Sequence, residues 1–204
     1  VDYHGFIGRT DVPSKDDNKE NVLIRLSPYV YGLSDEVFGS DELMALFTAN
    51  DMRRQLFFGD SIYSTVFEKP LWRPWFEQNL GVTTPEMYLI AAECEARVGS
   101  VGRAMNLLNK LRDNRIVGNT PLVAANKDEA LKLVLDERRR EFALTGLTRF
   151  IDLKRLNLDS RFAKTITHVV DGKVLTLPPN DPRWALPIPA RPLRFNKDML
   201  PNPR

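Results

Sequence analysis

The segment from Thr83 to Arg115 limits the possible folds of this chain most strongly, because it has the pattern of two helices joined at a glycine. Thr83 or Thr84 can cap the first helix, and the proline that follows suits its first turn. Gly99 can adopt the left-handed conformation that ends a helix, and Ser100 can cap the next one at once. The segment therefore predicts a helical hairpin.

Apolar residues recur at steps of three or four in both helices, which predicts one inward-facing stripe on each. Small residues among them would let the two backbones approach closely. This hairpin is the unit of tetratricopeptide-type repeats, and it needs neighbours to bury its stripe. The expected inward residues are Met87, Ile90 or Ala91, Cys94 and Val98 in the first helix and Val101, Ala104, Leu107, Leu108 and Leu111 in the second, with small residues at Ala91, Ala92, Ala96 and Ala104.

The composition is that of a globular protein, with 43% hydrophobic residues and a formal net charge of +2. So small a charge argues against nucleic acid or an acidic membrane as the partner. No apolar run is long enough to span a bilayer. The single cysteine, Cys94, allows no internal disulfide and is expected to be buried. Because the chain opens without a methionine or a signal segment, we interpret it as an excised piece or a processed product.

The N-terminal side of the hairpin is rich in loops. Residues 22–26 are predicted to form a short strand, and Ser40 to cap a short helix over 43–49. Residues 56–67 are β-prone, which predicts a hairpin or two extended pieces. Residues 70–80 hold two tryptophans in a loop interrupted by proline.

The C-terminal side is predicted to hold a second helical pair and then a β-hairpin. Asn126 and Glu129 form a capping box for a helix that ends at Gly146, and a shorter helix follows through Leu156. Next come β-prone runs at 166–170 and 174–177 around Asp171-Gly172, which predict a hairpin. The proline-rich tail from Pro178 is expected to lie extended, without helix, and to be held to the surface by Trp184, Leu186 and Ile188.

The charged block from Asp136 to Glu141 has two interpretations. It could bind an anion or phosphate. Because acids and bases alternate in it and in the residues from Arg149 to Arg155, we favour a network of ion pairs that locks two helices together. Asp136 and Arg140 are the expected pair at i, i+4.

No arrangement of residues predicts catalysis. Gly59-Asp60-Ser61-Ile62 is similar to the nucleophile block of one esterase class, but the only downstream histidine, His168, lacks the required aspartate three residues before it. The sequence has two histidines, His4 and His168, and one cysteine, Cys94, and they form no metal-ligand set of plausible spacing. We therefore predict a protein that is not an enzyme and that has no cofactor and no metal.

Aromatic residues in the loops are the candidate ligand-binding residues. Flat aromatic faces can stack on sugar rings, although each side chain could instead pack its loop onto the core. They lie on segments broken by proline and glycine. The candidates are Tyr29, Tyr31, Trp72 and Trp75.

Three blocks of the sequence together resemble the C-terminal part of the SusD/RagB family. They are Glu86–Arg112, Glu137–Asn157 and Trp184–Arg204, in the order and spacing of the family, and the similarity extends from about Ser40 onward. The usual small-acidic-Gly step appears here as Leu144-Thr145-Gly146, a mild departure.

The resemblance implies a mainly helical protein with tetratricopeptide-like antiparallel helix pairs, long loops, a small β-hairpin and an extended tail. It implies a non-catalytic surface lipoprotein of the outer membrane that binds glycans or other nutrients for a SusC-like TonB-dependent transporter. Full members are about twice as long as this chain. The resemblance therefore implies that the N-terminal half, with its lipid anchor, is absent here.

On this basis we expect one domain, 1–204. Residues 1–82 would form a loop-rich ligand face, 83–156 the helix pairs, and 157–204 the hairpin and tail. The alternative function is a helical-repeat scaffold that grips a peptide in its groove. A hydrolase acting through Ser61 is third.

Overall fold

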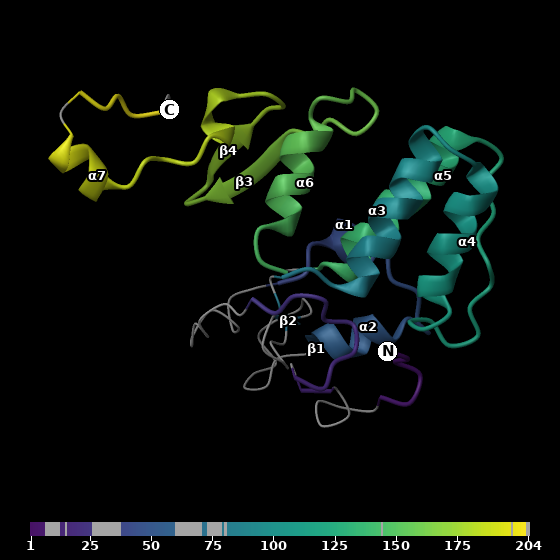
Figure 1. The fold of residues 1–204 in the computed structure, drawn as a ribbon. Helices are drawn as coiled ribbons and strands as arrows, with labels where there is room; N and C mark the ends of the chain where they lie inside the picture. Colours follow the sequence, from purple (N-terminus) through teal and green to yellow (C-terminus); the bar gives the residue numbers. More distant parts are fainter. Residues whose placement is uncertain are drawn as a thin grey trace. The chain divides into compact units, whose positions relative to one another are not determined.

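Figure 1 shows the computed structural model of the chain, which describes residues 1–6, 13–14, 16–25, 38–59, 71–72, 79, 81–143, 145–196 and 198–202. It divides into two compact units, Val1–Gly146 and Leu147–Arg204. The first contains α1 (Asp41–Met44), α2 (Met52–Phe57), β1 (Phe58–Gly59), β2 (Leu71–Trp72), α3 (Thr84–Arg97), α4 (Val101–Arg112) and α5 (Lys127–Glu141). The second contains α6 (Thr148–Leu156), β3 (Ile166–Val170), β4 (Lys173–Leu177), a 3₁₀ turn (Pro182–Trp184) and α7 (Ala190–Phe195).

The first unit is organised around three helices, α3, α4 and α5, which lie side by side in Figure 1 and contact one another. The predicted hairpin is confirmed, since α3 and α4 pack together across a three-residue break. The side chain of Asn126 accepts a hydrogen bond from the backbone N–H of Glu129, so the predicted cap of α5 is also confirmed. The mainly helical class predicted from the sequence is therefore correct.

The stripe predicted for the first helix is wrong in its rotational position. Met87, Ile90 and Val98 are 51%, 46% and 84% exposed, and Cys94 is exposed as well. Ala91, the alternative to Ile90, is also exposed. The buried face of α3 consists of Pro85, Leu89, Ala92, Glu93 and Ala96.

The physical reason is that α3 is apolar on two sides. The prediction followed the larger side chains, whereas α4 and α5 pack on the side that carries the alanines. Ala92 and Ala96 of α3 and Ala104 of α4 have no exposed surface. Small residues therefore do allow the helix backbones to approach closely, as predicted. In α4 the predicted face is largely confirmed, with Leu108 and Leu111 buried.

Gly99 makes room for a side chain and does not provide the predicted left-handed cap. Its φ is not among the positive values, so it is not a left-handed cap. A Cβ at this position would collide with the carboxylate of Glu95, which accepts a hydrogen bond from the backbone N–H of Ser100. Glu95 therefore caps the start of α4, whereas the side chain of Ser100 makes no capping bond.

Two predicted β segments before the hairpin are partly wrong. Residues 52–57 are helical as α2, because Asp51 caps the helix by accepting from the backbone N–H of Arg53. Strand structure begins only at β1. At residues 22–25 no strand is present, although the N–H groups of Val22 and Leu23 both donate to the carbonyl of Val82.

The apolar core beneath α1 and α2 joins both ends of the first unit. It is formed by buried residues from the N-terminus, from the 43–58 segment and from the turn just after α5. These residues are Tyr3, Leu43, Phe47, Met52, Leu56, Phe57, Phe58 and Ala143.

In the second unit, β3 and β4 form the predicted antiparallel hairpin, with Val170 opposite Lys173. Asp171 and Gly172 both have positive φ, as a two-residue turn between right-twisted strands requires. The tail is largely irregular, but the expectation that it holds no helix is wrong for the 3₁₀ turn and α7. Their prolines lie in first turns, where no backbone donor is needed. Trp184 is buried as predicted, whereas Leu186 is exposed.

Candidate functional site

The predicted ligand face lies mostly outside the described residues. Tyr29, Tyr31 and Trp75 fall there, as does Ser61 of the esterase-like block. Only the backbone of Trp72 is described, in β2, where it pairs with Phe58 of β1. Because Phe58 belongs to the apolar core, this pairing places the backbone of residue 72 next to a fixed part of the fold. The role of the four aromatics stays a prediction.

The most unusual described feature is a buried charged network between α5, α2 and the end of α4. Glu137, Arg140 and Glu141 lie three and four residues apart, so they share one face of α5. Arg53 comes from α2, Arg112 from the last turn of α4, and Arg115 follows it. We call these residues, together with Asp51 and Glu20, the charge network.

Arg53 is the central cation of the charge network and is fully buried. Its Nη2 lies 2.7 Å from both Asp51 Oδ2 and Glu137 Oε1, and its Nη1 donates to Glu141 Oε2 at 2.8 Å. Three carboxylates thus surround one guanidinium. A buried charge is tolerated when it is paired and hydrogen-bonded in this way.

Arg115 forms the second centre and is also fully buried. Its Nη2 donates to Glu141 Oε1 at 2.9 Å and to Glu20 Oε1 at 2.8 Å. Its guanidinium carbon lies 3.9 Å from the ring centroid of Tyr3, a cation–π contact. Arg115 therefore fastens the N-terminal segment to α5.

Glu137 is shared by two further arginines. Its Oε2 accepts from Arg112 Nη1 at 2.9 Å and from Nε and Nη2 of Arg140, while Arg140 Nη1 donates to the carbonyl of Leu46. Four arginines and four carboxylates therefore balance in the charge network. This favours a structural role over capture of a phosphate.

The predicted ion-pair network is present, but its members differ from those expected. Asp136 pairs with Lys132 on the surface at 2.6 Å, not with Arg140. Sequence reasoning missed Arg53, Asp51, Arg115 and Glu20, because the contacts that join them to α5 and to one another mostly link segments distant in sequence. Arg53 and Glu141, for example, are 88 residues apart.

The charge network shifts the pKa values of its carboxyl groups. Burial alone would raise the pKa of Glu137, but Arg53, Arg140 and Arg112 outweigh it and lower the value from 4.5 to about 2. Burial opposes the charged form of Glu141 too, and Arg115 and Arg53 hold its pKa below the usual value. Both groups are therefore carboxylates at neutral pH.

Acid is expected to destabilise the first unit through these two carboxyls. Because their folded-state pKa values lie below the ordinary 4.5, the stabilisation is complete above that pH and is lost as the pH falls toward about 2. Glu137 alone should contribute on the order of 3 kcal/mol. Urea unfolding at about pH 7, 4.5 and 2.5 measures this loss. An unchanged free energy of unfolding between the two lower values would contradict the assignment.

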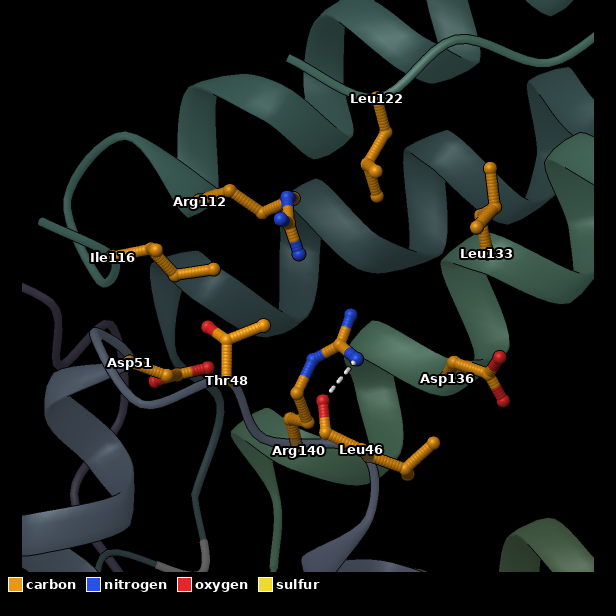
Figure 2. Close-up of a pocket in the computed structure, with 9 residues that line it drawn as sticks. All are labelled: Leu46, Thr48, Asp51, Arg112, Ile116, Leu122, Leu133, Asp136 and Arg140. Atoms are coloured by element: carbon orange, nitrogen blue, oxygen red, sulfur yellow. Dashed lines mark hydrogen bonds between the residues drawn. The ribbon is translucent and has the colours of Figure 1, made fainter. Parts of the chain in front are cut away.

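A cavity of about 190 Å³ lies beside the charge network. In Figure 2 the guanidinium groups of two lining residues, Arg112 of α4 and Arg140 of α5, point toward each other, and both donate to Glu137 Oε2. Arg112 Nε is buried and has no hydrogen-bond partner. The lining residues are Leu46, Thr48, Asp51, Arg112, Ile116, Leu122, Leu133, Asp136 and Arg140.

Two searches for other kinds of site found nothing in the described part of the chain. No three or more histidine, cysteine, aspartate or glutamate side chains are placed there to hold a metal ion together. None of the helices described is both long and apolar enough to cross a bilayer.

Two solved structures with a similar fold come from Parabacteroides distasonis and Bacteroides vulgatus. A SusD superfamily protein from Parabacteroides distasonis is 14% identical with a TM-score of 0.56, and the match covers 81% of this chain and 41% of that protein. A candidate sugar-binding protein from Bacteroides vulgatus is 22% identical with a TM-score of 0.52, and the match covers 79% of this chain and 37% of that protein. At these identities the likeness concerns the fold. The chain thus spans about two fifths of the length of these relatives.

Sequence comparison identifies the family. A search of curated proteins finds no match. The model of the SusD family, however, matches residues 84–204, which include α3 to α7 and the three blocks that carry the resemblance. The match covers more than half of the sequence, and the helical fold agrees with it. This chain therefore belongs to the SusD family.

Proposed function

We propose that this chain is part of a non-catalytic surface protein that captures a glycan or another nutrient. The carrying observation is the match of residues 84–204 to the SusD family. The similarity in fold to a candidate sugar-binding protein of Bacteroides vulgatus supports it. In this proposal the helices α3, α4 and α5 are a scaffold, and the loops of residues 1–82 make the ligand contacts.

The proposal extends to the partner and the location. The captured ligand would pass to a SusC-like TonB-dependent transporter in the outer membrane. The protein would be held at the cell surface by an N-terminal lipid anchor outside this chain. Co-purification of the transporter with the full-length protein from its native membrane tests this part. Recovery of the protein without any transporter, under conditions that keep membrane complexes intact, counts against it.

We propose Tyr29, Tyr31, Trp72 and Trp75 as the ligand-binding residues. A glycan array on the chain identifies a ligand, and calorimetry then measures its affinity for alanine variants. Because large aromatics dominate binding energy at interfaces, Trp72→Ala or Trp75→Ala should weaken binding about tenfold or more. Phe195→Ala is the matched control, since Phe195 is 83% exposed in α7 and lies outside the proposed face. Equal affinities for all variants would remove these residues from the site.

The alternative function is a helical-repeat scaffold for a peptide, and the exposed apolar face of α3 favours it. Met87, Ile90 and Val98 lie on this face. A scaffold would bind a peptide through this face and would keep its affinity when the loop aromatics are replaced. Loss of binding in Ile90→Ala together with retained binding in Trp75→Ala would therefore select this alternative.

A further inference from the structure

The side chain of Asn79 ties together two segments that are distant in sequence. Its Oδ1 accepts from the backbone N–H of Arg25 at 2.9 Å and from that of Gly81 at 2.8 Å. Its Nδ2 donates to Asn21 Oδ1 at 2.8 Å and to the carbonyl of Leu23 at 3.1 Å. A side-chain amide has two N–H donors and an oxygen that accepts two bonds, so these four bonds use its whole capacity. Asn79 is therefore fully engaged within the protein.

The junction around Asn79 is also fixed to the helical scaffold. The backbone N–H of Thr84, the first residue of α3, donates to the carbonyl of Glu20 at 2.7 Å. The carboxylate of Glu20 belongs to the charge network. We call residues 20–25 and 81–84, together with Asn79, the clasp.

Gly81 allows the two segments of the clasp to lie this close. A Cβ at this position would collide with the carbonyl oxygen of Leu23 and would lie 2.9 Å from Asn79 Oδ1. The first obstacle is backbone, so it could move aside only if the two segments separated. Asn79 and Gly81 thus close the clasp in two different ways, one by hydrogen bonds and one by the absence of a side chain.

The clasp adjoins, in sequence, two segments that carry proposed ligand-binding residues. Tyr29 follows Arg25 by four residues, and Trp75 precedes Asn79 by four. Both aromatics lie outside the described residues. Four residues of fully extended chain span at most about 14 Å, whatever path the chain takes. Connectivity alone therefore keeps the backbones of both aromatics within that reach of the clasp.

We propose that Asn79 is a positioning residue for ligand capture, which holds the segments of Tyr29 and Trp75 together so that both act on one ligand. The inference rests on the proposed function, and it assigns no contact between Asn79 and the ligand. Side chains on independent segments must be ordered when a ligand binds, which lowers affinity. The clasp reduces this loss, because it orders one end of each segment before the ligand arrives.

Calorimetry with the best ligand from the glycan array tests the proposal on Asn79→Ala. Affinity should fall about tenfold, the expected effect of having to order two large side chains on binding. Gly81→Ala, which opens the clasp by collision, should show a similar loss. Asn109→Ala is the matched control, because Asn109 also bridges two segments, by binding the backbone of Leu122 on both sides. It should lower stability but keep the affinity within about twofold, at a temperature where circular dichroism shows every variant folded.

A double-mutant cycle separates positioning from direct contact with the ligand. In a Trp75→Ala background the loss caused by Asn79→Ala should shrink to about threefold or less, because a positioning residue acts through the aromatic that it positions. An equal loss in both backgrounds would overturn the proposal. Unchanged affinity in both Asn79→Ala and Gly81→Ala would also overturn it, and would leave glycan capture itself intact.

Hydrogen exchange at the Arg25 amide tests the clasp without any ligand. This N–H donates to Asn79 Oδ1, so it should exchange about tenfold faster or more in Asn79→Ala. Unchanged exchange would overturn the clasp, and with it the positioning role, by itself. Failure of every glycan to bind the unmodified chain would instead count against the proposed function, so the two failures are distinguishable.

Discussion

Replacement of Glu137 by glutamine is expected to lower the free energy of unfolding by about 3 to 5 kcal/mol. Glu137 has no exposed surface and faces the guanidinium groups of Arg53, Arg112 and Arg140. Glutamine preserves the shape of the side chain but removes the charge. Arg53, Arg112 and Arg140 would then each lose one carboxylate partner in a region shielded from water, which leaves buried positive charge uncompensated. Urea unfolding at neutral pH, followed by circular dichroism, measures the loss.

Asp136→Asn is the matched control for this experiment. Asp136 is the preceding residue on the same helix, and its ion pair with Lys132 is largely exposed to solvent. Exposed pairs contribute little, so the change should be about 0.5 kcal/mol or less. If the two variants lost the same stability, the charge network would not be the main support of the first unit.

Leu89→Ala is expected to lower the free energy of unfolding by about 2 to 5 kcal/mol. Leu89 is 1% exposed and lies on the face of α3 that carries Ala92 and Ala96. Truncation there would leave a cavity between closely packed helices, whose backbones cannot collapse further. Denaturant unfolding of the variant against the unmodified chain gives the value.

The control is Ile90→Ala, one residue further along the same helix. Ile90 is 46% exposed, so its truncation should cost about 1 kcal/mol or less. This pair of variants decides which side of α3 is buried. The opposite order of effects would restore the Met87, Ile90, Cys94 and Val98 stripe as the inward face.

Local signals predicted the helices better than their faces. The start of α5 follows from its Asn126 cap, and Asp171-Gly172 is sufficient for the β-hairpin. The buried side of α3 depends on which side α4 and α5 pack against, because both Leu89 and Ile90 lie on apolar stripes. Side-chain size favoured the wrong stripe, since close helix packing here selects alanine.

Long-range contacts explain the other failures. Residues 56 and 57 are β-prone by composition, but the Asp51 cap and burial in the core make them helical. Local sequence patterns predict that the arginines of the charge network are exposed to solvent. They are buried because carboxylates from distant segments pair with them. The ligand-binding role of the loop aromatics stays a prediction, because their side chains lie outside the described part of the chain.

The most direct test of the division between scaffold and loops is a crystal structure of the chain saturated with its best ligand from the glycan array. We predict that the sugar contacts the loops of residues 1–82, with at least one ring stacked on Tyr29, Tyr31, Trp72 or Trp75. A ligand seated on the faces of α3, α4 or α5, with no contact to those loops, would contradict this account.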